Sequence, residues 1–148
     1  MGQSLPIISI ESFATSAPGS ANYDNDAADL YAALSEIGFA IIVGHGVGDK
    51  IVANMRNAVK AVFDTPREVL MQDMVVKGNY RGFVPLGYFT PNSGKGLADQ
   101  YEAWKLHNET DPSNPVCAAC SLYGPNKWPN ISFDVRTPIL AYWNALTK

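Results

Sequence analysis

The sequence predicts mixed α and β structure, on the basis of three observations. Apolar residues recur three or four positions apart in several segments, which is typical of helices that pack against a core. Short apolar or alternating runs lie between these segments, which is typical of strands. The 148 residues, 47% of them hydrophobic, suffice for one domain with a sizeable buried core, and no internal repeat or linker divides them.

The N-terminal segment is predicted to run from a strand through a loop into a helix. Residues 5–10 alternate weakly and indicate a short strand. Residues 14–25 are rich in Ser, Ala, Gly and Asn and indicate a loop. Asn25 or Asp26 can cap the helix that follows, and Gly38 ends it. The apolar face of this helix consists of Ala27, Leu30, Tyr31, Leu34 and Ile37.

A strand, a turn and a second helix are predicted next. Residues 39–43 are continuously apolar and rich in β-branched residues, which indicates a strand covered on both faces. His45 is interpreted as a hydrogen-bonding turn residue, because it stands between two glycines and no second titratable partner lies nearby. Asp49 can cap the second helix. The glycines expected to supply turn geometry are Gly38, Gly44, Gly46 and Gly48.

The middle of the chain carries one strong local signal. Thr65 is predicted to cap a further helix, with Pro66 at its first position and Glu68 completing a capping box. Residues 78–96 are dense in Gly, Pro, Tyr and Phe and indicate an irregular loop. Residues 100–106 alternate and indicate a strand.

The C-terminal part is predicted to be a long loop and a final helix. Residues 108–130 are interrupted by prolines. Cys117 and Cys120 lie in this loop, without the further soft ligands that zinc needs, and are interpreted as a reduced pair. Pro138 either begins the final helix, with Thr137 as its cap, or kinks it. The apolar residues that mark this helix are Phe133, Ile139, Tyr142, Trp143 and Leu146.

Composition excludes several classes of partner. The formal net charge is −3 and no basic block occurs, which argues against nucleic acid binding. The longest apolar run, residues 39–43, is far shorter than the roughly 20 residues that span a bilayer, so no membrane association is predicted. The start of the chain lacks the pattern of a secretory signal, and the expectation is a cytoplasmic protein.

Five phrases along the chain resemble, in order, the motifs of one enzyme family. They are 38–47 (GFAIIVGHGV), 63–68 (FDTPRE), 79–87 (NYRGFVPLG), 99–104 (DQYEAW) and 124–129 (GPNKWP). The family is that of the non-haem iron(II), 2-oxoglutarate-dependent dioxygenases, in the group that includes isopenicillin N synthase. The last phrase is the most specific of the five, and together they cover nearly the whole chain.

This resemblance implies a fold and an activity. Residues 5–130 would be the helical and strand lead-in domain of such an oxygenase. Residues 131–148 would begin a connecting helix toward a double-stranded β-helix (jelly-roll) barrel whose core is absent from this chain. The full-length enzyme is expected to use Fe(II) and 2-oxoglutarate to oxidise a small organic substrate by hydroxylation, desaturation or ring closure. The alternatives are a non-catalytic binding or regulatory remnant, or a truncated gene product.

The catalytic motifs of the family do not occur in this sequence. The resemblance implies that relatives bind iron through an H-x-D…H motif and bind the carboxylate of 2-oxoglutarate through an R-x-S motif. His107-Asn108-Glu109 satisfies the bare H-x-(D/E) pattern, but no histidine follows it. None of the four arginines, Arg56, Arg67, Arg81 and Arg136, begins an R-x-S. We therefore predict no catalytic residue, no metal ligand and no bound cofactor in this chain.

The resemblance also implies that the lead-in region lends residues to the rim of the substrate pocket. Tyr80, Arg81 and Phe83 are the predicted substrate-binding residues, because an exposed aromatic loop around one cation suits a substrate with a carboxylate. The alternative is that Arg81 is solvated and the aromatic residues only pack. The final helix is expected to expose an apolar face, covered either by the rest of the enzyme or by a protein partner.

Overall fold

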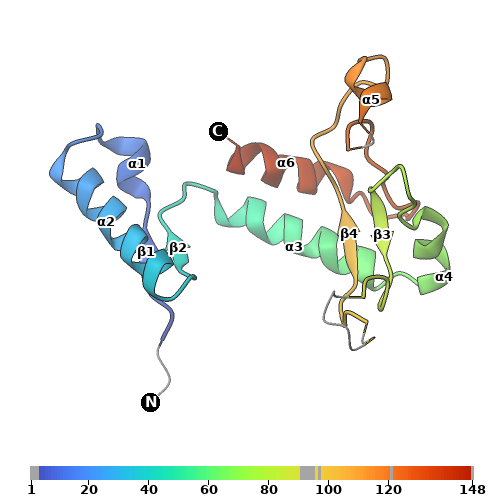
Figure 1. Cartoon of the computed structure of the whole chain (residues 1–148), viewed down its shortest axis with the longest axis horizontal. Coiled ribbons are helices and arrows are strands. Elements are labelled where there is room, and N and C mark those ends of the chain that lie inside the picture. The colour runs from blue at the N-terminus through green and yellow to red at the C-terminus, as the bar shows by residue number, and fades with distance from the viewer. Residues whose placement is uncertain (1–3, 91–95, 97, 121, 148) are drawn as a thin grey trace. The chain divides into compact units, whose positions relative to one another are not determined.

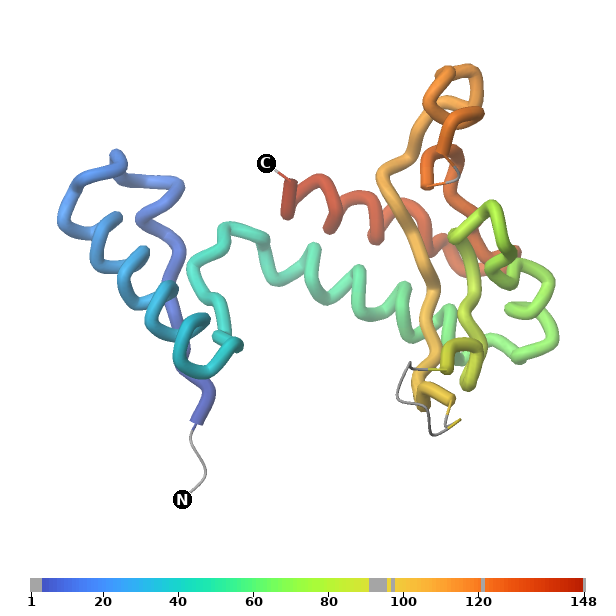
Figure 2. The backbone as a smooth tube through the Cα atoms, viewed as in Figure 1, coloured from blue at the N-terminus to red at the C-terminus, as the bar shows by residue number. Residues whose placement is uncertain are grey.

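The computed structural model describes residues 4–90, 96, 98–120 and 122–147, which fall into two units, Met1–Gly48 and Asp49–Lys148 (Figures 1 and 2). Residues 91–95, inside the predicted 78–96 loop, lie outside the described part. The sequence carries no signal of the division at Gly48. None of the helices in the described part combines the length and apolarity that crossing a membrane requires.

The first unit is a small strand–helix–helix–strand arrangement. Strand β1 (Ile7–Ser9) pairs in parallel with β2 (Ile41–Val43), with Ile7 opposite Ile41. Two helices, α1 (Glu11–Thr15) and α2 (Ala21–Glu36), connect the strands. The predicted strands at 5–10 and 39–43 are therefore confirmed in position.

Helix α2 begins earlier than predicted. It starts at Ala21 with Ser20 as its N-cap, not at Asn25 or Asp26, and α1 occupies part of the predicted loop. The Asp26 carboxylate instead accepts a hydrogen bond of 2.5 Å from the buried Ser12 hydroxyl, which ties α1 to α2. The first turns of α2 carry small and polar residues without apolar periodicity, so their composition resembled that of a loop.

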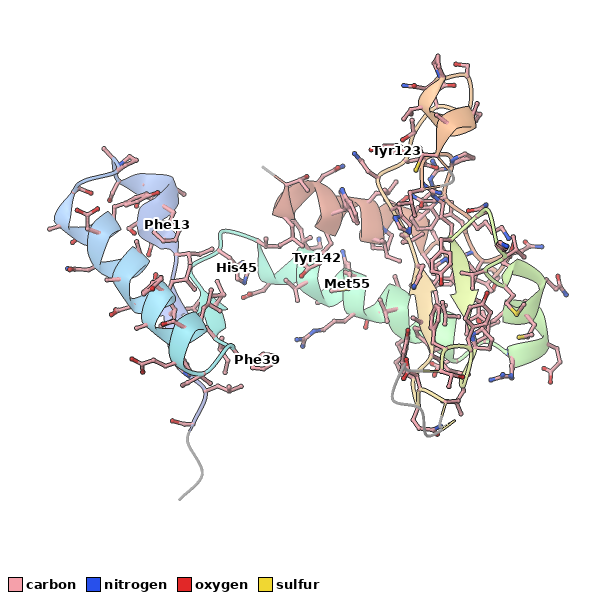
Figure 3. All side chains as sticks on the ribbon, in the orientation of Figure 1. Phe13, Phe39, His45, Met55, Tyr123 and Tyr142 are labelled. Atoms are coloured by element: carbon pink, nitrogen blue, oxygen red, sulfur yellow. The ribbon has the colours of Figure 1, made fainter. Side chains whose placement is uncertain are left out.

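The prediction that residues 39–43 are covered on both faces is wrong within this unit. Phe39 is 70% exposed and Ile41 is 46% exposed. The Phe39 side chain projects outward from the first unit (Figure 3). Strand β2 pairs with β1 alone among the described strands, and Tyr31 and Leu34 of the predicted apolar face of α2 are also exposed. Continuous apolar sequence indicates a strand, but it does not reveal what covers that strand.

Glycines form the turns around β2, as predicted for three of the four. Gly38, Gly44 and Gly46 have φ values of 84°, 67° and 72°, in the left-handed region that favours glycine. Gly38 follows α2 and donates its N–H to the carbonyl of Ala33, which closes the helix. Gly48 does not have a positive φ, so this part of the prediction is wrong.

The second unit combines two helices that pack against each other with a two-stranded antiparallel sheet (Figure 1). The long helices are α3 (Asp49–Phe63) and α6 (Arg136–Leu146), and the strands are β3 (Gly82–Val84) and β4 (Ala103–Lys105). The short elements are α4 (Arg67–Leu70), the 3₁₀ helix η1 (Met71–Asp73) and α5 (Val116–Ala119).

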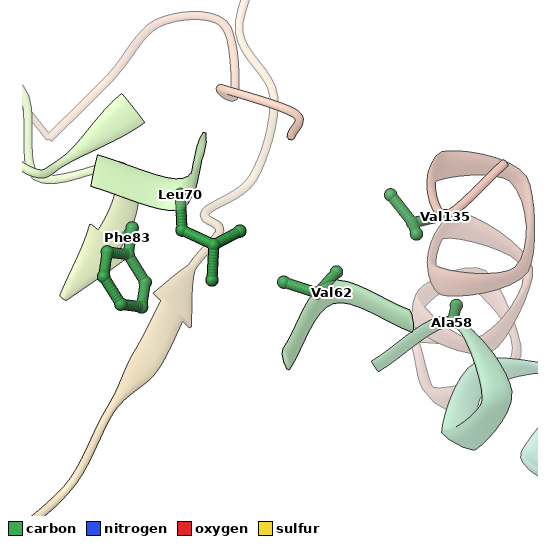
Figure 4. Packing of buried hydrophobic residues seen from close by; sticks show 5 residues of the cluster. All are labelled: Ala58, Val62, Leu70, Phe83 and Val135. Atoms are coloured by element: carbon green, nitrogen blue, oxygen red, sulfur yellow. The ribbon is translucent and has the colours of Figure 1, made fainter. Parts of the chain in front are cut away.

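The core of this unit joins helix α3 to the sheet. Its five buried side chains come from four parts of the chain (Figure 4): Ala58, Val62, Leu70, Phe83 and Val135. Half-buried apolar residues pack around them, namely Ala61, Trp104, Trp128, Ile131 and Ile139. Fully burying a side chain the size of valine or phenylalanine contributes about 1.5–3 kcal/mol, so this cluster holds the strands in place against α3.

Two predicted helix caps differ in the structure. Helix α3 begins at Asp49 itself, so Asp49 is part of the first turn and does not cap it. Its negative charge there interacts favourably with the positive end of the helix dipole. Thr65 does not cap α4: its hydroxyl donates backward to the carbonyl of Ala61 at 2.8 Å. Pro66 is the N-cap of α4, without a side-chain hydrogen bond, so the predicted capping box is wrong. The last carbonyls of α3 lack partners within the helix, so they compete with the start of α4 for the Thr65 hydroxyl.

Strand β3 lies inside the region predicted to be an irregular loop. It forms where Gly82, with φ of +109°, passes directly against the backbone carbonyl of Asp73. The Phe83 carbonyl accepts the Val75 N–H at 2.9 Å, which holds the strand on its other edge. A Cβ atom at position 82 would overlap the Asp73 carbonyl oxygen, so only glycine permits this approach.

The first turn of helix α6 is stabilised by a residue that the sequence analysis did not single out. The helix begins at Arg136, with Val135 as its N-cap and Pro138 as its third residue, so the prediction that Pro138 begins it with Thr137 as cap is wrong. The Asp134 carboxylate accepts the Thr137 backbone N–H at 3.1 Å. Hydrogen bonds donated by Thr137, from its side chain and its backbone, lower the pKa of Asp134 below the usual 3.8.

We expect Gly82→Ala to destabilise the chain more than Gly78→Ala. Both glycines have φ above +100°, which costs alanine of order 1–3 kcal/mol, but a Cβ at 78 meets open space. At 82 it also meets a backbone carbonyl, so the loss should exceed that of the control by about 1 kcal/mol or more. Urea unfolding of both variants measures the difference, and equal losses would contradict the close approach.

We expect Asp134→Ala to lower the melting temperature at pH 7 and to lose that effect in acid. A carboxyl whose pKa is lowered by folding stabilises the fold above its unfolded pKa, and this contribution disappears as the pH falls through the folded value. Asp134→Asn keeps an acceptor for Thr137 without a titrating charge, so its loss at pH 7 should be smaller than that of the alanine variant and should also shrink in acid. Thermal unfolding from pH 7 down to pH 2 measures both; a pH-independent loss in the alanine variant would contradict this account.

Candidate functional site

Two of the three predicted substrate-binding residues are buried. Arg81 is 1% exposed and Phe83 is 0% exposed, so the expectation of an exposed loop is wrong for both. The alternative that Arg81 is solvated is also wrong, because its Nη2 donates to the Leu122 carbonyl at 2.6 Å. Phe83 belongs to the core, as the packing alternative held. Arg81 directly precedes β3, and Phe83 is the middle residue of that strand.

Tyr80 is half-buried and contacts a cation that the sequence analysis missed. The Lys105 ammonium lies 4.5 Å from the centroid of the Tyr80 ring and 4.8 Å from that of Phe89. Lys105 is the last residue of β4 and is paired with Gly82 in the strand register. Its neighbour Trp104 pairs with Phe83 and faces the core, so alternation directs Lys105 to the opposite face.

Further rings surround Phe89. Its centroid lies 6.0 Å from that of Tyr80 and 6.4 Å from that of Tyr101, with the Tyr101 ring nearly parallel. Tyr88 meets it edge-on at 4.8 Å. We call the group Tyr80, Phe89, Tyr101 and Lys105 the aromatic clasp. It offers flat apolar surface beside one positive charge, and the signal in the sequence was strand alternation at 100–106, which separates Lys105 from Trp104.

His107 is engaged in backbone hydrogen bonds. Its N–H donates to Asn126 Oδ1 at 2.9 Å, and Asn126 Nδ2 donates to its carbonyl at 2.8 Å. Its ring Nε2 lies 3.2 Å from the Tyr80 carbonyl oxygen. The side chain of Asn126 thus continues the pairing of β4 beyond Lys105, and His107 supports the backbone beside Tyr80.

The residues present do not fit an Fe(II) centre. Within the described ranges, no three His, Cys, Asp or Glu side chains come together in a way that could hold a metal ion. His45 lies in an exposed turn, where its Nδ1 accepts the Val47 N–H at 3.1 Å, and this confirms its predicted role. Cys117 and Cys120 are free thiols, and Cys117 donates to the Asp111 carbonyl at 3.3 Å.

An apolar hollow of about 210 Å³ lies where α3 and α6 meet the sheet. Its walls include Met55, Val59, Phe63, Trp104, Trp128 and Tyr142. Trp104 Nε1 donates to the Lys127 carbonyl at 3.0 Å, whereas Trp128 Nε1 is buried without a hydrogen-bond partner among the described residues. The predicted apolar face of α6 is exposed at Trp143 and Leu146, while Ile139 and Tyr142 are half-buried.

The fold and the site define a mixed α/β unit that presents rings and a cation on one sheet face. Residues 5–131 match the family model described as "non-haem dioxygenase in morphine synthesis N-terminal". Because this match covers most of the sequence, the chain belongs to that family.

Curated relatives are oxygenases. The chain is 34% identical to the 2-oxoglutarate-dependent dioxygenase caaD of Aspergillus niger, over 82% of its own length and 37% of the relative. It is 31% identical to a homoarginine-6-hydroxylase of Oryza sativa subsp. japonica, over 70% of its length and 31% of the relative. It is 30% identical to validamycin A dioxygenase of Streptomyces hygroscopicus subsp. limoneus, over its whole length and 40% of the relative. The chain thus spans well under half of each of these proteins.

A solved structure supports the same fold. A protein of Caulobacter crescentus, described as belonging to the 2OG-Fe(II) oxygenase family, matches 99% of this chain with a TM-score of 0.63 and 22% identity. The match covers 42% of that protein. The mixed α/β structure is therefore one that occurs within an oxygenase of this kind.

We expect Asn126→Asp to destabilise the second unit. The carboxylate loses the donor that bonds the His107 carbonyl and places a negative charge beside it, a loss of about 1–3 kcal/mol. Asn108→Asp, at an exposed position, makes the same chemical change and should stay within about 0.5 kcal/mol of the parent chain. Urea unfolding compares the two, and an Asn126→Asp variant as stable as the parent chain would contradict a bridging role for this side chain.

Proposed function

We propose that this chain is the N-terminal part of a 2-oxoglutarate- and Fe(II)-dependent oxidoreductase that acts on a small organic substrate. The observation that carries the proposal is the family match over residues 5–131, together with relatives of which the chain covers only 31–40%. In this proposal residues 5–130 form the N-terminal domain, and residues 131–148 lead toward a jelly-roll barrel. Residues outside this chain hold Fe(II) and 2-oxoglutarate and supply the oxidising chemistry.

In this proposal the 148-residue chain packs against the rest of the enzyme and forms part of the substrate pocket. The exposed Trp143 and Leu146 of α6, and the apolar hollow beside α3, provide surface for packing against the remainder of the enzyme. Each such side chain that becomes buried there contributes about 1.5–3 kcal/mol. This packing would hold the second unit in a fixed position beside the substrate pocket.

Tyr80, Arg81 and Phe83 keep a place in this proposal, with different tasks. Tyr80 is half-buried beside Lys105 and contacts the substrate. Phe83 anchors β3 in the core, and Arg81 fixes the same strand through the Leu122 carbonyl. Arg81 and Phe83 are therefore positioning residues, and substrate specificity lies on the face of the sheet that carries Tyr80.

We expect the protein made in its source cells to be substantially heavier than this chain. Its reading frame should continue past Lys148 into an H-x-D, a later histidine and an R-x-S. Intact mass spectrometry and sequencing of the transcript measure this directly. A product that ends at Lys148 would contradict the proposal and favour a non-catalytic remnant or a truncated product.

The matched biochemical test is succinate formation from 2-oxoglutarate with added Fe(II). We expect the longer protein to form succinate and the purified 148-residue chain to form none. The comparison uses the same iron and oxygen supply for both. Robust turnover by the 148-residue chain would overturn the assignment of cofactor binding to residues outside it.

A further inference from the structure

We propose that the aromatic clasp binds the carboxylate of a small organic acid with an apolar skeleton, with Lys105 as the residue that receives the charge. The inference deepens the proposed function, on which it rests, by naming the chemical class of the substrate. Nothing in the family match assigns this lysine a role.

The first argument is the charge balance around Lys105. The ion pairs formed among the described residues use Lys60 with Asp64, Arg67 with Glu102, and Arg136 with Glu109. In the same part of the chain, no carboxylate lies within ion-pair distance of the Lys105 ammonium. Lys105 is half-buried as a residue, and its ammonium has no carboxylate partner among the described residues, so it is available to pair with the negative charge of a ligand.

The second argument is the geometry of the two rings that hold the ammonium. Tyr80 and Phe89 lie at 4.5 and 4.8 Å from it, which restricts a side chain that is otherwise flexible. Ring faces attract the cation but leave its three N–H donors without strong acceptors. A carboxylate oxygen makes the short, charge-assisted hydrogen bonds that such donors favour.

The third argument concerns the rest of the ligand. Tyr101 stacks on Phe89 and Tyr88 meets it edge-on, so apolar ring surface continues away from the ammonium. Gly82, opposite Lys105 in the register, contributes no side chain to this face. An acid whose carbon skeleton is apolar therefore contacts the rings while its carboxylate meets Lys105. Arg81 cannot serve instead, because it is buried and bonded to the Leu122 carbonyl.

The test uses phenylacetate as the probe and the purified 148-residue chain as the protein. Calorimetric titration and NMR of the lysine side chains measure the dissociation constant and identify the lysine that shifts. We expect saturable binding, a shift of the Lys105 signals, and binding weakened roughly tenfold or more by Lys105→Met. Lys105→Arg keeps the charge and the stacking on the rings and should retain most of the affinity.

The control variant is Lys77→Met, which removes an exposed lysine of the same unit and should leave the dissociation constant unchanged. Thermal unfolding checks that each variant is folded, and Lys105→Gln replaces the methionine variant if that one is not. Phenethylamine, with the same skeleton and the opposite charge, should not bind. Inorganic phosphate that binds as tightly as phenylacetate, or a Lys105→Met variant that binds like the parent chain, would overturn the inference.

This measurement fails separately from the proposed function, because it requires neither iron, oxygen nor 2-oxoglutarate. One outcome is that phenylacetate binds through Lys105 while the longer protein forms no succinate. That outcome would support the proposed role of the aromatic clasp and contradict the proposed oxygenase function. If the longer protein forms succinate but phenylacetate binding is unaffected by Lys105→Met, only the proposed role of the aromatic clasp is contradicted.

Discussion

The antiparallel pairing of β3 with β4 determines which side chains of the second unit enter the core and which reach the aromatic clasp. Phe83 lies opposite Trp104, and both face helix α3. One residue further along β4, Lys105 takes the other face, where its ammonium meets Tyr80. A shift of the register by one residue would exchange these faces, burying the lysine and exposing the tryptophan. The close passage of Gly82 over the Asp73 carbonyl fixes the position of β3 against η1.

Elements with a strong local pattern could be predicted from the sequence. The helix at 49–63 and the strands at 5–10, 39–43 and 100–106 occur where apolar spacing indicated them. The role of His45 also followed from local chemistry, because its partner Val47 is two residues away. In each case the information lies within a few neighbouring residues, and distant contacts only reinforce it.

Features that depend on distant contacts could not be predicted. Thr65 bonds a carbonyl of the preceding helix rather than capping the next, and the choice depends on where α3 ends. Arg81 is buried because a carbonyl 41 positions later, that of Leu122, accepts its hydrogen bond. The candidate site changed for the same reason. The sequence motif predicted Arg81 as the cation of the substrate-binding site. In the structure the cation beside Tyr80 is Lys105, which the pairing of β3 with β4 places there.

The bridge that Asn126 forms to His107 has an evolutionary consequence. Together with the hydrogen bond from the Thr110 N–H to the Gly124 carbonyl, it closes the base of the excursion that carries α5. Once the base is closed, residues 111–120 can lengthen without disturbing the sheet, because each doubling of a flexible loop costs only about 0.6 kcal/mol in closure entropy. This excursion is therefore where homologues are free to differ in length, and where a reporter peptide can be inserted while the clasp stays intact.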